Sequence, residues 1–232
     1  MEIDCYLAMT AAEIANSAAL PEKTAWMACH FSSYGTGLSN LPDSLPAGSL
    51  LILNDRTPWR NHDPGQIVDQ VEECLAALDC RGLLLDFQRP GCPEVAQLSE
   101  LLSGWLRVPV GVSEPYAAGL SCPIFLPPVP LQRPLADHLA PWQGREIWLE
   151  LALDCEEILL TPEGCTVTPL LPWDAPDSTH RDSTLHCGYS LKLKENSAGF
   201  TLSRTREDLD AMLKEAANRG VTTAVGLWQE LA

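Results

Sequence analysis

Basic residues are scarce in this sequence. Its 232 residues include 15 Lys and Arg but 31 Asp and Glu, which gives a formal net charge of −16 at pH 7. Nucleic acids and anionic membrane surfaces attract proteins that carry clustered Lys and Arg. The charge balance therefore predicts that neither a nucleic acid nor a membrane is a partner.

Long apolar runs and paired cysteines are also missing. No stretch of the sequence approaches the roughly 18 apolar residues of a membrane-spanning helix, and the segment from Met1 to Cys5 lacks the basic start of a secretory signal. The nine Cys residues are scattered without a C-x-x-C pair, which excludes a zinc ribbon. Unpaired thiols without a signal are typical of a reducing compartment. We therefore expect a cytoplasmic protein, or an extracellular or cell-wall protein if a leader has been removed.

Metal and cofactor motifs are weak as well. Cys29-His30 and His186-Cys187 are adjacent pairs. Neighbouring residues of a strand point to opposite faces, so each pair can supply at most one metal ligand. Gly35-Thr36-Gly37 lacks the third glycine of a dinucleotide-binding loop. The sequence predicts no metal and no cofactor, and it contains no indication of the oligomeric state.

What the sequence does contain is a recurring pattern of a short apolar strand followed by a helical or polar stretch. Eight strands are expected, at residues 3–9, 24–32, 48–53, 81–88, 108–113, 122–126, 146–153 and 221–228. Helices are expected at residues 10–19, from Asp63 onward, at 93–106 and from Thr205 to Gly220. Asp63 followed by Pro64 is a typical helix start, because the Asp side chain caps the first turn and Pro fits its first position.

Strands separated by helical crossings predict the α/β class with a parallel sheet. Eight such units that close on themselves form a (β/α)8 TIM barrel, and the chain is shorter than the roughly 250 residues typical of that fold. We therefore expect a compact barrel that lacks full helices at residues 35–47 and 114–121. An open doubly wound α/β sheet is the alternative. The expected organisation is a single domain, residues 1–232, with a hairpin-rich insertion after strand seven at about 154–204.

Within that insertion, turn residues separate strand-like runs. Thr161-Pro162-Glu163-Gly164 predicts the turn of one hairpin, and Glu195-Asn196-Ser197 predicts that of another, between 187–193 and 199–203. Residues 172–184 are rich in Pro and Asp and are expected to form a loop.

Polar side chains gather at the ends of the expected strands, where TIM barrels carry their chemistry. An acidic, aromatic and amide-rich rim suits a neutral ligand with many hydroxyl groups. The ligand-binding candidates are Tyr34, Asn54, Asp55, Asp154, Trp228 and Glu230. In the fourth strand, alternation places Gly82, Leu84, Asp86 and Gln88 on one face. Asp86 and Gln88 are therefore expected to project together into the barrel mouth.

The segment from Arg81 to Gln88 (RGLLLDFQ) resembles the D-G-x-D-x-D-x-E strand of family 18 glycoside hydrolases, the chitinase family. It falls on the fourth expected strand, as in that family, and many members carry a subdomain after strand seven. The ending Ala224 to Trp228 (AVGLW) resembles the family's last strand, whose Trp floors the sugar site. Cys29-His30-Phe31 lies where family members place an aromatic residue on strand two. The resemblance implies a TIM barrel whose partner is an oligosaccharide containing N-acetylglucosamine.

The departures from the family pattern bear on catalysis. Gln88 stands where the family has its proton-donating Glu, and an amide cannot donate that proton. Arg81 and Leu84 stand at the first Asp positions, and only Asp86 remains. Strand six shows Phe-Leu-Pro-Pro at 125–128 in place of the family's Met-x-Tyr-Asp. Loss of the acid alone removes a factor of roughly 10²–10⁴ from catalysis. The resemblance therefore implies that the family mechanism cannot run here as written.

Three functional hypotheses remain. In the first, the barrel binds carbohydrate without hydrolysis: Trp228 stacks on a sugar ring, while Asp86, Gln88 and Asn54 hydrogen-bond to its polar groups. In the second, the protein is an active glycosidase in which Asp86 forms a catalytic pair with a relocated carboxylate. The candidate partners of Asp86 are Glu114, Asp154 and Glu230. In the third, the barrel is a scaffold that displays loops to a partner other than carbohydrate.

Overall fold

Eight parallel strands close into a barrel in the computed structural model, which describes residues 2–172 and 178–232. The barrel strands are β1 (Asp4–Met9), β2 (Thr24–Phe31), β4 (Leu50–Asn54), β5 (Gly82–Asp86), β6 (Val110–Ser113), β7 (Ile124–Leu126), β8 (Ile147–Leu151) and β14 (Val221–Leu227). The sheet closes because β1 pairs in parallel with β2 on one side and with β14 on the other. This confirms the (β/α)8 TIM barrel and rules out the open doubly wound sheet.

Several of the helices are short, as the chain length requires. They are α1 (Ala11–Asn16), α2 (Pro64–Ala77), α3 (Pro93–Trp105), α4 (Leu135–Leu139), α5 (Arg206–Ala216) and α6 (Trp228–Leu231). Single 3-10 turns are η1 (Glu114–Tyr116), η2 (Ala140–Trp142) and η4 (Ala217–Arg219). Residues 35–47 hold only the short strand β3 (Leu38–Ser39), and 114–121 hold only η1, so both expected losses of a helix are confirmed. Across the described residues, no helix has the length and apolar character to cross a membrane.

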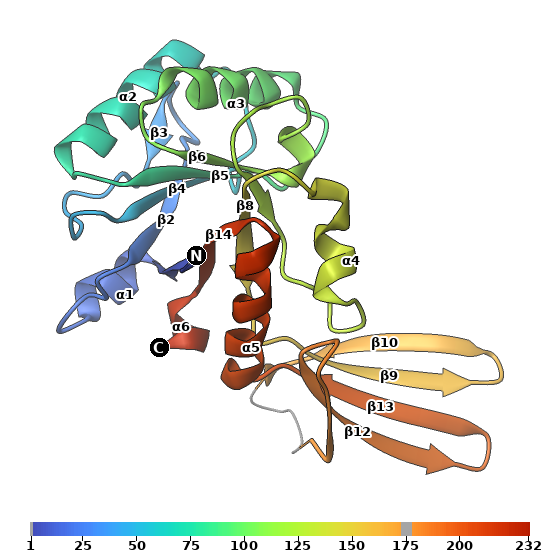
Figure 1. Cartoon of the computed structure of the whole chain (residues 1–232). Helices are drawn as coiled ribbons and strands as arrows, with labels where there is room; N and C mark the ends of the chain where they lie inside the picture. Colours follow the sequence, from blue (N-terminus) through green and yellow to red (C-terminus); the bar gives the residue numbers. More distant parts are fainter. Residues whose placement is uncertain (1, 173–177) are drawn as a thin grey trace. The chain divides into compact units, whose positions relative to one another are not determined.

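Helix α2 begins as its sequence predicts. The Asp63 side chain accepts hydrogen bonds from the backbone N–H groups of Gly65 and Gln66, and Pro64 occupies the first turn. Its buried face is formed by Ile67, Val71 and Leu75. Figure 1 shows α2 and α3 lying side by side along β4, β5 and β6. These two helices cover the outer face of that part of the barrel.

The inside of the barrel is filled by alternate residues of its strands. On β5, Leu84 belongs to the interior cluster, while Leu83 and Leu85 are buried on the outer face, so the predicted alternation is confirmed. The interior cluster contains Tyr6, Ala8, Ala25, Leu50, Ile52, Leu84, Phe125, Trp148 and Val225. A Cβ atom on Gly111 would lie 2.3 Å from the Trp148 ring. The indole of Trp148 thus fits inside the barrel only because β6 presents a glycine there.

The chain divides into two compact units. The barrel unit comprises Asp4–Pro127, Arg145–Glu150 and Thr222–Ala232, and the second unit contains Pro128–Gly144 and Leu151–Val221. The prediction of a single domain over the whole chain stays a prediction.

The second unit contains an antiparallel sheet in the strand order β10-β9-β13-β12-β11. Its strands are β9 (Cys155–Thr161), β10 (Gly164–Leu170), β11 (His180–Asp182), β12 (Cys187–Lys194) and β13 (Ser197–Ser203). Both predicted hairpins are therefore confirmed, and Figure 1 shows them side by side. The prediction of a loop over 172–184 was wrong for β11, whose three residues pair with β12. Residues 173–177 of that loop lie outside the described residues.

Candidate functional site

A cavity of about 540 Å³ lies at the carboxyl ends of the barrel strands. Its apolar wall belongs to the barrel interior and includes Ala8, Ile52, Leu84, Phe125 and Val225. Its polar lining includes Thr10, Asn40, Asn54, Asp55, Arg56, Asp86, Gln88 and Glu150. The volume lies within the roughly 300–1,000 Å³ of small-molecule sites, which also combine an apolar wall with a few polar groups. The cavity is therefore the candidate site of the barrel unit.

Asp86 and Gln88 meet in this cavity, as the strand alternation predicted. Asp86 is the last residue of β5, and the side-chain amide of Gln88 donates a hydrogen bond to its Oδ1 atom. Burial raises the pKa of Asp86; the hydrogen bond from Gln88 opposes this shift, and the nearby charge of Asp55 adds to it. The pair thus offers a half-buried carboxylate and an exposed amide to a ligand.

Asp55 and Asn54 also line the cavity, but their hydrogen bonds hold the walls in place. Asp55 is 7% exposed, and its two carboxylate oxygens accept the backbone N–H groups of Gln88 at 3.1 Å and Arg89 at 2.8 Å. The Asn54 amide donates to the carbonyl of Met27 at 2.9 Å, and its oxygen accepts the backbone N–H of Arg56 at 3.1 Å. These contacts position the segment that follows β5 and the end of β4.

A second set of contacts fixes the same segment from β6. The Ser113 hydroxyl accepts the backbone N–H of Phe87 at 2.9 Å and donates to its carbonyl at 2.8 Å. The Tyr116 hydroxyl donates to the carbonyl of Arg89. The backbone on both sides of Gln88 is therefore held by Asp55 after β4, by Ser113 at the end of β6 and by Tyr116 in η1, which limits how far the amide can move.

Glu150 also lines the cavity, although the sequence analysis did not predict it as a site residue. Strand seven was expected to run to residue 153, with Asp154 at its end, whereas β8 ends at Leu151. Trp148 points into the barrel, so Glu150, two residues later, points to the same side nearer the carboxyl end. The alternation in Glu146–Leu151 (EIWLEL) is the signal that could have identified it.

Several predicted site residues lie outside this cavity. Tyr34 is fully exposed, and Glu114 is exposed at the start of η1. Asp154 belongs to the second unit, and Glu230 lies on α6. The cavity lining includes none of these four side chains. Their roles in binding or catalysis stay predictions.

The placement of Trp228 requires a correction. It was expected to end the last strand, but β14 ends at Leu227 and Trp228 begins α6. The indole therefore leaves the inward alternation of the strand and lines a different hollow, beside α1. The chain turns into a helix one residue earlier than expected, so Trp228 does not floor the cavity.

Over residues 2–172 and 178–232, no cluster of three or more His, Cys, Asp or Glu side chains is placed to hold a metal ion. The thiols of Cys29, Cys80 and Cys187 are buried, and burial raises the pKa of each, which disfavours the reactive thiolate form.

Solved structures of similar fold were found. A chitinase from Chromobacterium violaceum superposes with a TM-score of 0.63 at 12% identity, covering 98% of this chain and 95% of its own. The chitinase-like agglutinin RobpsCRA from Robinia pseudoacacia gives a TM-score of 0.64 at 12% identity with the same coverage. The spore cortex-lytic enzyme SleL from Bacillus cereus gives 0.61 at 10% identity, covering 100% of this chain and 72% of that enzyme.

The fold is a TIM barrel similar to those of these chitinase-like structures. No protein-family model matches the sequence, and no curated protein is significantly similar to it. Identities of 10–12% support a common fold and leave the family assignment as a resemblance.

Proposed function

We propose that this protein binds oligosaccharides containing N-acetylglucosamine in the barrel cavity and does not cleave them by the family 18 mechanism. The observation that carries the proposal is the Gln88–Asp86 pair. Gln88 stands where the resemblance places the family's proton donor. Its side-chain amide donates a hydrogen bond to the Asp86 carboxylate. A neutral amide can hydrogen-bond to a ligand, but it has no proton acidic enough to be given to a leaving group.

The remaining lining of the cavity fits such a ligand. Sugars present hydroxyl and acetamido groups together with apolar ring faces. Asp86, Gln88, Glu150 and Arg56 supply acceptors and donors, and Phe125 lies in the apolar wall. The fixed backbone around Gln88 keeps this arrangement ordered before the ligand arrives, which lowers the entropic cost of binding. The name of one structural neighbour, a chitinase-like agglutinin, also describes binding rather than cleavage.

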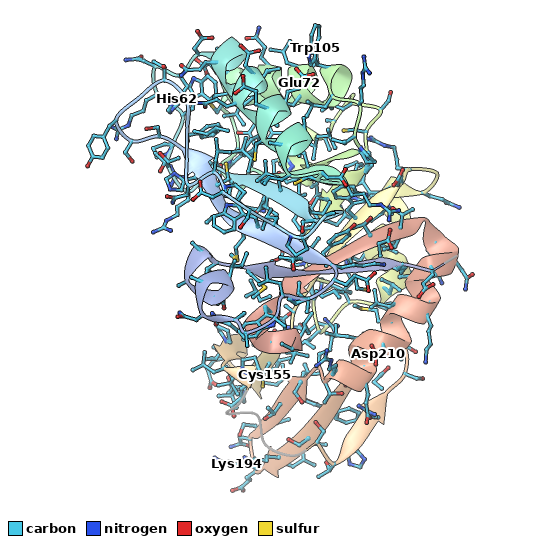
Figure 2. All side chains as sticks on the ribbon, turned by 90° about the vertical axis from the view of Figure 1, so that its left-hand side faces the viewer. His62, Glu72, Trp105, Cys155, Lys194 and Asp210 are labelled. Carbon is cyan, nitrogen blue, oxygen red and sulfur yellow. The ribbon has the colours of Figure 1, made fainter. Side chains whose placement is uncertain are left out.

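The test is isothermal titration of the protein with N-acetylglucosamine oligomers of two to six units, with product analysis of the same mixtures. We expect saturable heat and intact oligomers. Asp86→Ala should weaken binding about tenfold or more, since hydrogen bonds to a charged group contribute about 1.5–3 kcal/mol. Asp210→Ala is the matched control, because Asp210 is exposed on α5 (Figure 2) and should bind like the unaltered protein.

Two other outcomes of the titration would favour a different function. Absence of heat with every oligomer, together with absence of cleavage, would overturn the proposal and favour a scaffold that binds something other than carbohydrate. Cleaved oligomers would favour the second candidate function.

That second candidate is a glycosidase in which Asp86 works with Glu150 rather than with Glu114, Asp154 or Glu230. The observation that favours it is that Asp86 and Glu150 both line the cavity, while burial raises the pKa of Asp86 toward the range of a proton donor. Hydrolysis by two carboxyl groups requires a separation of about 5–10 Å. In that case Asp86→Asn and Glu150→Gln should each abolish cleavage, while Asp210→Asn should not.

A further inference from the structure

Trp228 lines a hollow of its own. This hollow has a volume of about 490 Å³ and lies between α6 and α1 in the barrel unit. Its lining consists of Ala12, Glu13, Asn16, Ser17, Ala18, Ala19 and Trp228. The three alanines leave the space beside the indole open, and three polar residues border it. The volume falls in the same range of about 300–1,000 Å³ as the cavity.

The hollow adjoins the cavity of the barrel. Ala12 lines both spaces, and its neighbours divide between them: Ala11 lines the cavity, and Glu13 lines the hollow. The residues at the junction of β14 and α6 divide in the same way: Leu227 lines the cavity and Trp228 lines the hollow. The two spaces therefore share a wall, formed by α1 around Ala12 and by the junction of β14 and α6.

The walls of the hollow are tied together. Gln229, next to Trp228, donates from its side-chain amide to Glu13 Oε1 at 2.6 Å. The other carboxylate oxygen of Glu13 accepts the backbone N–H and the hydroxyl of Thr10, which caps α1, and Ser17 bonds back to the Glu13 carbonyl at 2.7 Å. These bonds join two helices from opposite ends of the chain. The indole of Trp228 is half-buried beside this bonded wall.

We infer that the hollow is an outer subsite, in which Trp228 stacks on a further sugar unit of an oligosaccharide whose first units occupy the barrel cavity. This inference rests on the proposed function and adds to it the length of ligand that the protein prefers. A flat indole offers an apolar face to the C–H groups of a pyranose ring. The carboxylate, amide and hydroxyl groups of Glu13, Asn16 and Ser17 stand at the border, where the ring's hydroxyl groups would lie.

The test compares oligomer lengths in two tryptophan variants. N-acetylglucosamine dimer, tetramer and hexamer are titrated calorimetrically into the unaltered protein, Trp228→Ala and Trp105→Ala. Trp105 is the matched control: it is 68% exposed on α3, and its indole nitrogen donates to Glu72 on α2 at 3.3 Å, outside both spaces (Figure 2). Thermal unfolding of each variant checks that it is folded.

We expect the tetramer to bind at least tenfold more tightly than the dimer, and Trp228→Ala to abolish that difference while leaving dimer affinity within about twofold. Trp105→Ala should keep the length dependence. Equal affinity for dimer and tetramer in the unaltered protein, or a length dependence that survives in Trp228→Ala, overturns the outer subsite and leaves the proposed function intact. Absence of binding with all three oligomers overturns both.

Intrinsic fluorescence gives a second readout. In Trp105→Ala, hexamer should shift or quench the emission in a saturable way, and the dimer should do so much less. In Trp228→Ala that length-dependent part of the signal should disappear. A signal that depends equally on dimer and hexamer in both variants counts against stacking at Trp228.

Discussion

The side-chain amide of Gln88 donates a hydrogen bond to Asp86 Oδ1 at the carboxyl end of β5. The contact joins a carboxyl group, which can exchange a proton, to an amide, which cannot. It also makes the pair sensitive to any change that removes the donor.

Gln88→Glu should lower the free energy of unfolding at pH 7 by roughly 1–3 kcal/mol, because the half-buried Asp86 would lose its donor and face a like charge. The loss should shrink as the pH falls, because burial and the like charge raise the pKa of the pair and one carboxyl group then takes up a proton and becomes a donor again. Denaturant unfolding at several pH values measures the loss of unfolding free energy at pH 7 and its decrease at lower pH. Gln97→Glu, the same change at an exposed position of α3, should have little effect. Equal stability losses in the two variants would contradict the prediction.

Gly111→Ala should lower the free energy of unfolding by about 1–3 kcal/mol, because its methyl group would lie 2.3 Å from the Trp148 ring. Gly104→Ala is the control, since its methyl group meets no atom within 4 Å at the end of α3, and it should be neutral or slightly stabilising. Adding Trp148→Phe to Gly111→Ala should recover part of the loss by removing ring atoms at the clash. If Trp148→Phe recovers none of the unfolding free energy lost in Gly111→Ala, the loss does not come from a clash with the Trp148 ring.

His62 should make stability depend on pH. It packs against Phe31 and Trp59 with ring centroids 5.3 and 5.2 Å away, and burial lowers its pKa, an effect that the backbone of Thr36 opposes. The unfolded chain takes up a proton near pH 6.5, but the folded protein does so only at lower pH. The free energy of unfolding should therefore fall as the pH drops below about 6.5, until the folded protein is also protonated.

The measurement for His62 is denaturant unfolding between pH 8 and pH 5. His62→Phe keeps the aromatic contacts and should flatten the decline, and His180→Phe, at an exposed position of β11, should not. An unchanged slope in His62→Phe would assign the pH dependence to another group.

Arg204→Lys should destabilise the second unit by about 2–4 kcal/mol. The Arg204 side chain is 3% exposed, and its guanidinium donates to the carbonyl groups of Val129, Leu185 and His186. A lysine keeps the charge, but its single ammonium group cannot reach the three carbonyl groups that the planar guanidinium of arginine bridges. Buried carbonyl groups therefore lose their hydrogen-bond donors. Hydrogen exchange of β12 and β13 should report the loss. Arg206→Lys, exposed two residues later, should leave exchange unchanged.

Local features of the chain could be predicted because local physics decides them. The Asp63 cap, the two hairpin turns and the alternation of β5 depend on residues within a few positions of one another. Alternation alone was enough to predict that Asp86, at the end of β5, and Gln88, two residues beyond it, face the cavity. Repetition of strand and crossing eight times was enough to predict the barrel.

The composition of the site was decided by tertiary structure. Glu150 and Asp86 line one cavity because barrel closure brings the ends of β8 and β5, which are not neighbours in the sheet, to the same space. Trp228 lies outside the cavity because the chain enters α6 immediately after β14. The next residue, Gln229, donates a hydrogen bond to Glu13, which is near the other end of the sequence. Strand alternation depends on neighbouring residues, so the sequence by itself determined which face each strand buries. Contacts between distant segments, which form only when the barrel closes, decided which side chains share a cavity.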